Sequence, residues 1–234
     1  MQYFELTPLT HLSLADLDLD ALSDYLAAHG DYGRDHEKSQ LLTHWGLLHE
    51  GHPTVAGMLL FGHEPQRYIP YARIDAARFS GTDWGVLPVE AQNISGQLLE
   101  VIASAEIFLQ SVVPGAVHAI LREGVINAVV HRDYSIQQSI HLFVLEDRIQ
   151  IHSPGCPPPS VTLTNMGAGV HVLRNPRIYT RLASADFMPY GCMGIARIYG
   201  FLREQTGYGL SLSIGAEAQG EVIFSIRNGL AIKA

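Results

Sequence analysis

Two helical patterns that run directly into a pair of strands most constrain how this chain folds. Apolar side chains at helical spacing predict a long amphipathic helix over residues 89–113 and a second apolar helix over residues 116–132. Residues 139–155, SIHLFVLEDRIQIHSPG, then alternate apolar and polar side chains on both sides of Glu146 and Asp147. This alternation predicts a β-hairpin, so helices and strands share one unit.

The residues before this unit are predicted to form a small α/β unit of their own. Its expected elements are two helices, residues 13–29 and 37–48, and two strands, residues 53–62 and 71–81. Ser13 is the expected cap of the first helix. The loop TDWGVLP ends at Pro88, and we place the boundary there, between residues 1–88 and 89–234.

The C-terminal third of the chain begins with a segment too rich in Pro and Gly for regular structure. This segment, residues 156–177, is long for a plain connection, which makes it a candidate functional loop. A short helix after Pro176 and another over residues 192–204 are expected to follow. Residues 210–229 close the chain as a second predicted hairpin.

Charge and hydropathy exclude several classes of protein. The 15 basic and 23 acidic residues give a formal net charge of −8, which repels a phosphate backbone, so we expect no unaided DNA binding. No apolar run approaches the roughly 20 residues that span a bilayer, and the N-terminus shows no signal peptide. We therefore expect a cytoplasmic protein without a membrane partner. The absence of GxxxxGK[ST] excludes a P-loop.

Neither the cysteines nor the histidines indicate a metal centre. The two cysteines, Cys156 and Cys192, match no zinc spacing and are expected to be reduced thiols. The densest histidine group, His44, His49 and His52, lacks the HExxH spacing that places two imidazoles on one helix face. We therefore expect these histidines to be solvated surface residues.

A polar stripe runs along the second apolar helix, in the stretch REGVINAVVHRDY. Glu123, Asn127 and His131 lie at positions i, i+4 and i+8, and apolar residues cover much of the rest of the helix. A stripe with apolar flanks is typical of a helix that lines a cavity. A helix with one solvated edge explains the periodicity equally well.

Two glycine motifs and a concentration of arginines favour the cavity. The hairpin ends in IHSPG, and GCMG places Gly191 and Gly194 before a predicted helix, whose free N–H groups and dipole favour an anion. Arginine is suited to bidentate phosphate contacts. Eight of the thirteen arginines fall between residues 122 and 203: Arg122, Arg132, Arg148, Arg174, Arg177, Arg181, Arg197 and Arg203.

The motifs LREGVINAVVHRDYS, DRIQIHSPG, RNPRIY and GCMGIARI occur in an order and at spacings that resemble a known bacterial domain. They resemble the C-terminal domain of proteins labelled RecG-related helicases or Schlafen AlbA-type transcriptional regulators. Residues 41–83 resemble the segment that precedes this domain in the same proteins. The resemblance covers about residues 10–205.

This resemblance implies a fold and a ligand. The domain is similar to the ATP-binding fold of gyrase, Hsp90, histidine kinases and MutL, so we expect an α+β chain with a two-layer α/β sandwich, helices covering one face of a mixed sheet. By position, Asn127 would be the ligand of the Mg²⁺ that ATP carries, and Glu123 would be the base that activates water. A purely structural role for Asn127, holding the following HRDY turn, is the alternative.

The resemblance also implies residues around the bound nucleotide, and two of its motifs are incomplete here. HSPG falls where the fold has an Asp-x-Gly that receives the adenine amino group, but the aspartate is missing, and GCMG lacks a third glycine. The implied nucleotide-binding residues are Asn127, His131, Arg132, Gly155, Arg174, Asn175, Gly191 and Gly194. The segment His131 to Asp133 is alternatively only the turn into the sheet.

Three functions are consistent with these patterns. The first is a nucleotide-sensing module of a transcriptional regulator, the second a slow Mg-dependent ATPase that uses Glu123, and the third a non-binding interaction or homodimerisation scaffold. A helicase is not expected, because motor chemistry and a basic channel are both missing. The AlbA-type module that binds nucleic acid in such regulators has no counterpart in this sequence, so we expect contact with DNA only through a module outside this chain, as in a fragment or a short form.

Overall fold

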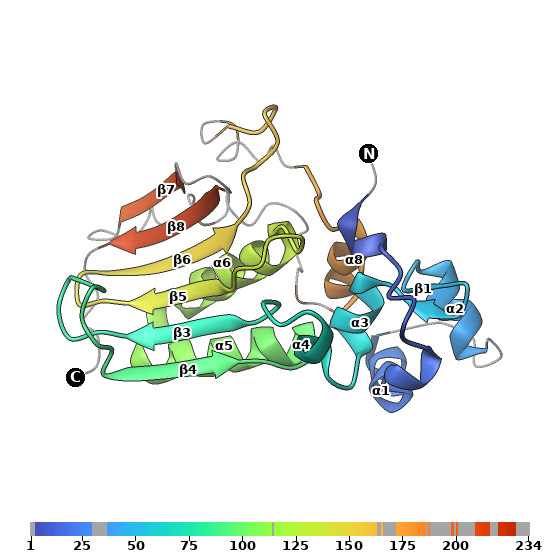
Figure 1. Ribbon diagram of the computed structural model, residues 1–234. Helices are drawn as coiled ribbons and strands as arrows, with labels where there is room; N and C mark the ends of the chain where they lie inside the picture. The colour runs from blue at the N-terminus through green and yellow to red at the C-terminus, as the bar shows by residue number, and fades with distance from the viewer. Residues whose placement is uncertain are drawn as a thin grey trace.

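The computed structural model describes residues 3–29, 37–113, 115–162, 165, 172–185, 187, 198, 200, 209–215 and 220–227. Its largest element is a mixed six-stranded sheet with the strand order β4-β3-β5-β6-β8-β7 (Figure 1). β3 and β5 are parallel, and all other neighbours are antiparallel. The strands are β3 (Ile74–Arg78), β4 (Glu90–Ile94), β5 (Ile140–Val144), β6 (Arg148–Pro154), β7 (Gly209–Gly215) and β8 (Glu221–Arg227).

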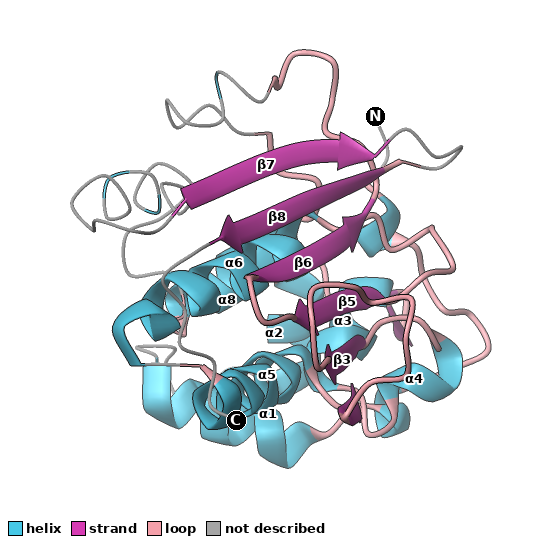
Figure 2. Cartoon of the chain, turned by 90° about the vertical axis from the view of Figure 1, so that its left-hand side faces the viewer, coloured by secondary structure: helices cyan, strands magenta, loops and turns pink. Residues whose placement is uncertain are grey.

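Two long helices, α5 (Leu98–Val112) and α6 (His118–His131), cover one face of this sheet (Figures 1 and 2). The inward residues of β5 are Ile140, Leu142 and Val144, all buried in the core beneath these helices. α6 approaches closely at Gly124, where a Cβ atom would lie 3.0 Å from Ile151 and 3.1 Å from Phe224. The predicted α+β architecture with a two-layer sandwich is therefore confirmed.

A mainly helical group packs at the end of the sandwich, on the right of Figure 1. It contains η1 (Phe4–Leu6), η2 (Leu14–Asp16), α1 (Leu19–His29), α2 (Lys38–His44), β1 (Leu48–His49), β2 (His52–Pro53), α3 (Val55–Phe61) and α4 (Pro65–Tyr68). A later helix, α8 (Pro176–Ser184), joins this group beside α3. The short turn η3 (Gly115–Val117) connects α5 to α6.

A buried carboxylate connects α8 to the N-terminus of the chain. The Glu5 carboxylate accepts hydrogen bonds from the first free N–H groups of α8, those of Arg177 at 2.8 Å and Ile178 at 3.1 Å. Burial raises the pKa of Glu5, while these two N–H groups act in the opposite direction. The contact satisfies helix donors that otherwise have no partner inside the helix.

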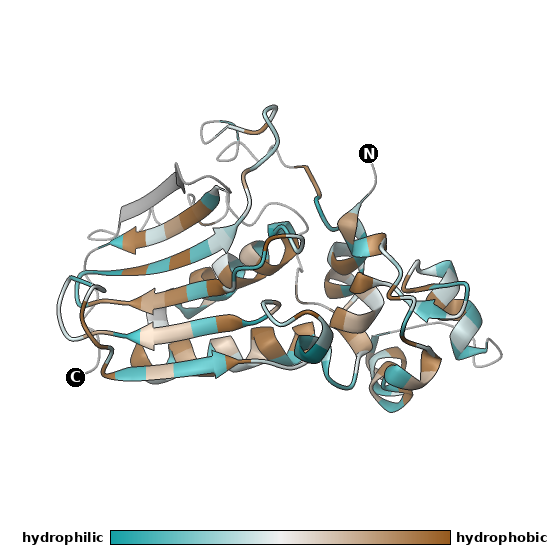
Figure 3. Ribbon diagram, in the orientation of Figure 1, coloured by the Kyte–Doolittle hydropathy of each residue, from teal (hydrophilic) through white to brown (hydrophobic). Residues whose placement is uncertain are grey.

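The prediction of a strand over residues 53–62 is wrong, because this segment contains α3. All seven residues of α3 are buried, so no polar face marks the helical period (Figure 3). Periodicity alone does not distinguish such a short apolar run from a strand. The helix begins after Thr54, whose side chain accepts from Gly57 N at 3.2 Å.

The predicted helix 89–113 starts too early, because residues 90–94 form the edge strand β4. Asn93 Nδ2 donates to Asp75 Oδ1 of β3 at 2.6 Å, and Ile94 lies opposite Ile74 in the register. Gly96 then takes a φ of +130°, which breaks the strand before α5 begins with a capping box at Gln97. The remainder of the predicted helix is confirmed as α5.

The sheet continues across Pro88, where a boundary between units was predicted. β3 belongs to the first predicted unit, yet it pairs with β5 of the second over residues 74–78 and 140–144. One cluster of buried apolar residues also includes members from both predicted units. The hydrogen-bonded sandwich therefore begins with β3, before Pro88.

Most of the remaining predicted elements are confirmed. The first hairpin is β5 with β6, the closing hairpin is β7 with β8, and the helix after Pro176 is α8. The predicted helices at residues 13–29 and 37–48 appear as the shorter α1 and α2, and Ser13 caps η2. Of the predicted helix 192–204 only residues 198 and 200 are described, both as helical, and Gly191 and Gly194 lie outside the described residues. No helix in the described part of the chain is long and apolar enough to cross a membrane.

Candidate functional site

Helix α6 presents the polar stripe on a side that is turned away from its helical neighbour. Arg122 faces α5, where its Nε donates to Glu106 Oε2 at 3.1 Å, and Gly124 faces the sheet. The helical repeat of 100° per residue places Glu123 and Asn127 together on a third side. Glu123 is buried, with 7% of its surface exposed, and Asn127 is half-buried.

The Asn127 amide is oriented by a hydrogen bond within its own helix. Its Nδ2 donates to the Glu123 carbonyl oxygen at 2.8 Å, so the side chain does not hold the HRDY turn. Its Oδ1 forms no hydrogen bond with the described residues. An amide oxygen is a hard ligand of the type that Mg²⁺ takes, together with phosphate and water oxygens. Asn127 therefore fits a metal that arrives already bound to phosphates.

The described residues contain no group of three or more His, Cys, Asp or Glu that could hold a metal ion without help. A Mg²⁺ ion that arrives on a nucleotide is held by one or two protein ligands together with phosphate and water oxygens. Glu123 precedes Asn127 by about 6 Å of helix rise. His131 follows it by the same rise and ends α6, half-buried.

Arg132 is fully enclosed, with 1% of its surface exposed. Its Nη1 donates to Tyr71 O at 2.5 Å, and its Nη2 donates to Ile136 O at 3.2 Å and Gln138 O at 2.6 Å. The guanidinium also lies 4.9 Å from the Tyr134 ring centroid. Burial lowers the pKa of Arg132. Because both Nη groups donate to backbone carbonyls, the arginine fixes the turn into the sheet, and we leave it out of the ligand set proposed below.

Asn175 also makes buried contacts with backbone carbonyl groups. Its Nδ2 donates to Val130 O and to Arg132 O, both at 2.8 Å, and 1% of its surface is exposed. These carbonyls belong to the C-terminal end of α6, which lacks partners within the helix. Asn175 therefore connects α8 to α6, and we leave it out of the ligand set as well.

Gly155 and Arg174 meet beside Asp133, just beyond the end of α6. Gly155 has a φ of +108°, and a Cβ atom there would lie 2.7 Å from Asp133 Cβ and 3.0 Å from Arg174 Nη1. Arg174 donates to the Asp133 carboxylate and to the Cys156 carbonyl. Only glycine fits this left-handed and crowded position. The structure thus brings Gly155 and Arg174 together beside Asp133, which follows Asn127 by six residues.

The strand end before Gly155 contains no carboxylate to accept an adenine amino group. Ser153 stands at the aspartate position of the Asp-x-Gly motif, and its hydroxyl donates to Ala128 O at 3.0 Å. His152 points to the opposite face of the sheet, where its Nδ1 lies 3.3 Å from Glu221 Oε2. Burial lowers the pKa of His152, and the Glu221 carboxylate acts in the opposite direction.

The spacing-based predictions missed two residues that organise this region. Asp133 accepts from Ser135 N at 3.0 Å and pairs with Arg174, and Ser153 links β6 to α6. An Asp followed two residues later by Ser is the sequence signal of an Asx turn, and it was present in HRDYS. The Ser153 contact spans 25 residues and has no local signal.

Comparison with known proteins supports the resemblance in the second half of the chain. Residues 137–214 match the family described as "Putative ATP-dependent DNA helicase recG C-terminal". This match confirms the resemblance over that segment, which includes Gly155, Arg174 and Asn175 but not Glu123 or Asn127. Comparison with curated proteins finds no match.

A solved structure shares the fold over nearly the whole chain. The DIP2311 protein from Corynebacterium diphtheriae superposes with a TM-score of 0.73 at 20% sequence identity, and the similarity covers 98% of the present chain. The chain spans 40% of the length of that protein. At this identity the likeness shows the fold alone.

Proposed function

We propose that this chain binds a nucleotide, ATP or a close relative, together with Mg²⁺, and acts as the sensing module of a transcriptional regulator. The observation that carries the proposal is the half-buried Asn127 amide, whose Oδ1 is uncommitted within the described residues. It stands on α6, one of the two helices that cover the sheet, and the segment that follows matches the family described as "Putative ATP-dependent DNA helicase recG C-terminal".

Each retained residue has a specific part in binding. Asn127 Oδ1 completes the coordination of Mg²⁺, and the metal supplies charge neutralisation to the phosphates when bound. Gly155 has no side chain, so the backbone there can approach the nucleotide closely. Its N–H already donates to Gly220 O at 3.0 Å and is therefore not counted as a donor to the nucleotide. Arg174, held by Asp133, supplies a cation for a phosphate, and His131, at the end of α6, borders the proposed site. Gly191 and Gly194 complete the phosphate contacts in this proposal.

The regulatory part of the proposal concerns a longer protein. The sequence has no P-loop and carries a net charge of −8, so we propose no unwinding activity and no direct DNA contact by this chain. We propose that other parts of a longer protein contact DNA. We also propose that a homodimer of that protein transmits the nucleotide state. Nucleotide binding does not depend on either assignment.

A thermal shift with Mg-ATP tests the proposed binding. Ligand at about 100 times its dissociation constant stabilises the native state by about 2.7 kcal/mol, so we expect Tm to rise by roughly 5 to 10 °C for a chain of this size. The rise should disappear when EDTA removes Mg²⁺. A flat response to every nucleotide tested would contradict the proposal and support the scaffold function.

A slow ATPase is the second candidate, because buried Glu123 lies one helical turn from Asn127. In that case Glu123 accepts the proton of the attacking water. We expect Glu123→Gln to retain Mg-ATP binding and to abolish phosphate release, measured with a phosphate-coupled assay. No phosphate release from the unmutated chain would exclude turnover while leaving the sensing function intact.

A further inference from the structure

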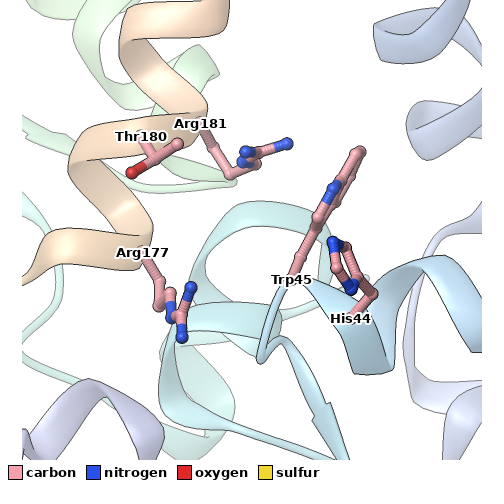
Figure 4. Close-up of a pocket in the computed structure, with 5 residues that line it drawn as sticks. All are labelled: His44, Trp45, Arg177, Thr180 and Arg181. Carbon is pink, nitrogen blue, oxygen red and sulfur yellow. The ribbon is translucent and has the colours of Figure 1, made fainter. Parts of the chain in front are cut away.

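A cavity lies between the C-terminal end of α2 and helix α8. Figure 4 shows His44 and Trp45 on one side and three side chains of α8 on the other. The three are Arg177, Thr180 and Arg181, which one turn of helix brings to the same face. The cavity measures about 170 Å³ and shares no residue with the α6 site.

Arg181 is buried in this cavity wall without a full set of partners. It exposes 8% of its surface, and its guanidinium lies 4.1 Å from the centre of the Trp45 ring. Its Nη1 is inaccessible to solvent and forms no hydrogen bond. A buried charged group without a full set of acceptors is costly. The same guanidinium lines the cavity, where a ligand from outside the chain can supply the missing negative charge.

The second arginine, Arg177, is exposed and reaches toward the same space. In the part of the chain that the structure describes, no carboxylate lies within ion-pair distance of either guanidinium. This is notable in a protein with 23 acidic and 15 basic residues. The Glu5 carboxylate accepts from the backbone N–H of Arg177, so it is engaged with the helix end.

The other lining groups restrict what enters. The Thr180 hydroxyl already donates to Pro176 O at 2.7 Å, so it presents only lone pairs to the cavity. His44 contributes an exposed imidazole opposite the arginines. The two guanidinium groups of Arg177 and Arg181 and the single carboxylate of Glu5 leave an excess of positive charge around the cavity. The cavity is also smaller than the roughly 300 to 1,000 Å³ typical of drug-sized ligands.

We propose that this cavity is a binding site for a phosphoryl group, held by Arg177 and Arg181. Guanidinium groups bind phosphate oxygens in a bidentate manner. The Trp45 ring packs against the Arg181 guanidinium and holds it in place by a cation–π contact. The volume suits inorganic phosphate or the terminal phosphate of a larger molecule. This site is separate from the proposed nucleotide site and stands without it.

Tryptophan fluorescence tests the proposal, because Trp45 touches Arg181. Trp84, the second of two tryptophans, is 50% exposed and stacks on Phe143, so Trp84→Phe leaves Trp45 as the single reporter. Titration with inorganic phosphate at constant ionic strength should give a saturable change. Arg177→Gln should weaken the affinity about 10- to 100-fold, the loss of one charged hydrogen-bonding group.

Matched variants keep the result interpretable. Arg67→Gln removes another exposed arginine, on α4, and should leave the phosphate affinity unchanged, as should Asn127→Ala. Arg177 is the main test because its side chain is exposed and its substitution leaves the core intact, whereas Arg181 is buried. No saturable response of the parent, or equal affinities for Arg177→Gln and Arg67→Gln, would overturn the site. Loss of binding in Asn127→Ala would also overturn it, by assigning the phosphate to the α6 site.

Discussion

Arg132→Ala is expected to lower the free energy of unfolding by about 3 to 5 kcal/mol, measured by urea denaturation. The substitution removes a buried side chain and the donors that three part-buried backbone carbonyls use, those of Tyr71, Ile136 and Gln138. Each carbonyl left without a partner costs roughly 1 to 3 kcal/mol, and the costs are less than additive. Native domains have only about 5 to 15 kcal/mol of stability, so this loss is severe.

Arg67→Ala is the matched control for this substitution. Its guanidinium pairs with Glu64 on the surface, where the arginine side chain is 69% exposed, so its loss should change stability by about 0.5 kcal/mol or less. If Arg132→Ala behaved like this control, the structural role assigned to Arg132 would be wrong. Arg132 would then return to the set of candidate phosphate ligands.

Asn127→Ala is expected to have the opposite profile, with a large effect on binding and a small one on stability. Its single hydrogen bond stays within α6, and alanine is a better helix former. The free energy of unfolding should therefore change by about 1 kcal/mol at most. Loss of the metal ligand should weaken Mg-ATP binding about 10- to 100-fold. Gln92→Ala, which removes an exposed amide from β4, should leave the affinity unchanged.

Patterns confined to one element predicted their elements well. The alternation in residues 140–151 predicted β5 and β6, because a half-covered sheet imposes a period of two on its strands. The polar stripe of α6 was likewise readable from its four-residue spacing. In α3 no exposed face existed, but Thr54 before the apolar run and Gly62 after it were a helix cap and a helix stop that could have corrected the prediction.

Contacts between distant segments were beyond prediction from spacing. Glu5 binds the N-terminus of α8 across 172 residues, and Asn175 reaches the end of α6 across 45 residues. The charged Arg132 resembled a phosphate ligand in the sequence, and only the fold shows that backbone carbonyls surround it. The same limit applies to β4, whose pairing with β3 overrides a helical apolar pattern.

Isothermal titration of Mg-ATP into the unmutated chain and into Asn127→Ala tests the central claim most directly. The expected result is a saturable, Mg²⁺-dependent heat of binding with one nucleotide per chain, and an affinity about 10- to 100-fold weaker in the variant. Matching urea curves would show that the variant is still folded. The absence of binding heat in the unmutated chain, or equal affinities in the two proteins, would contradict the assignment of Asn127 and the nucleotide site on α6.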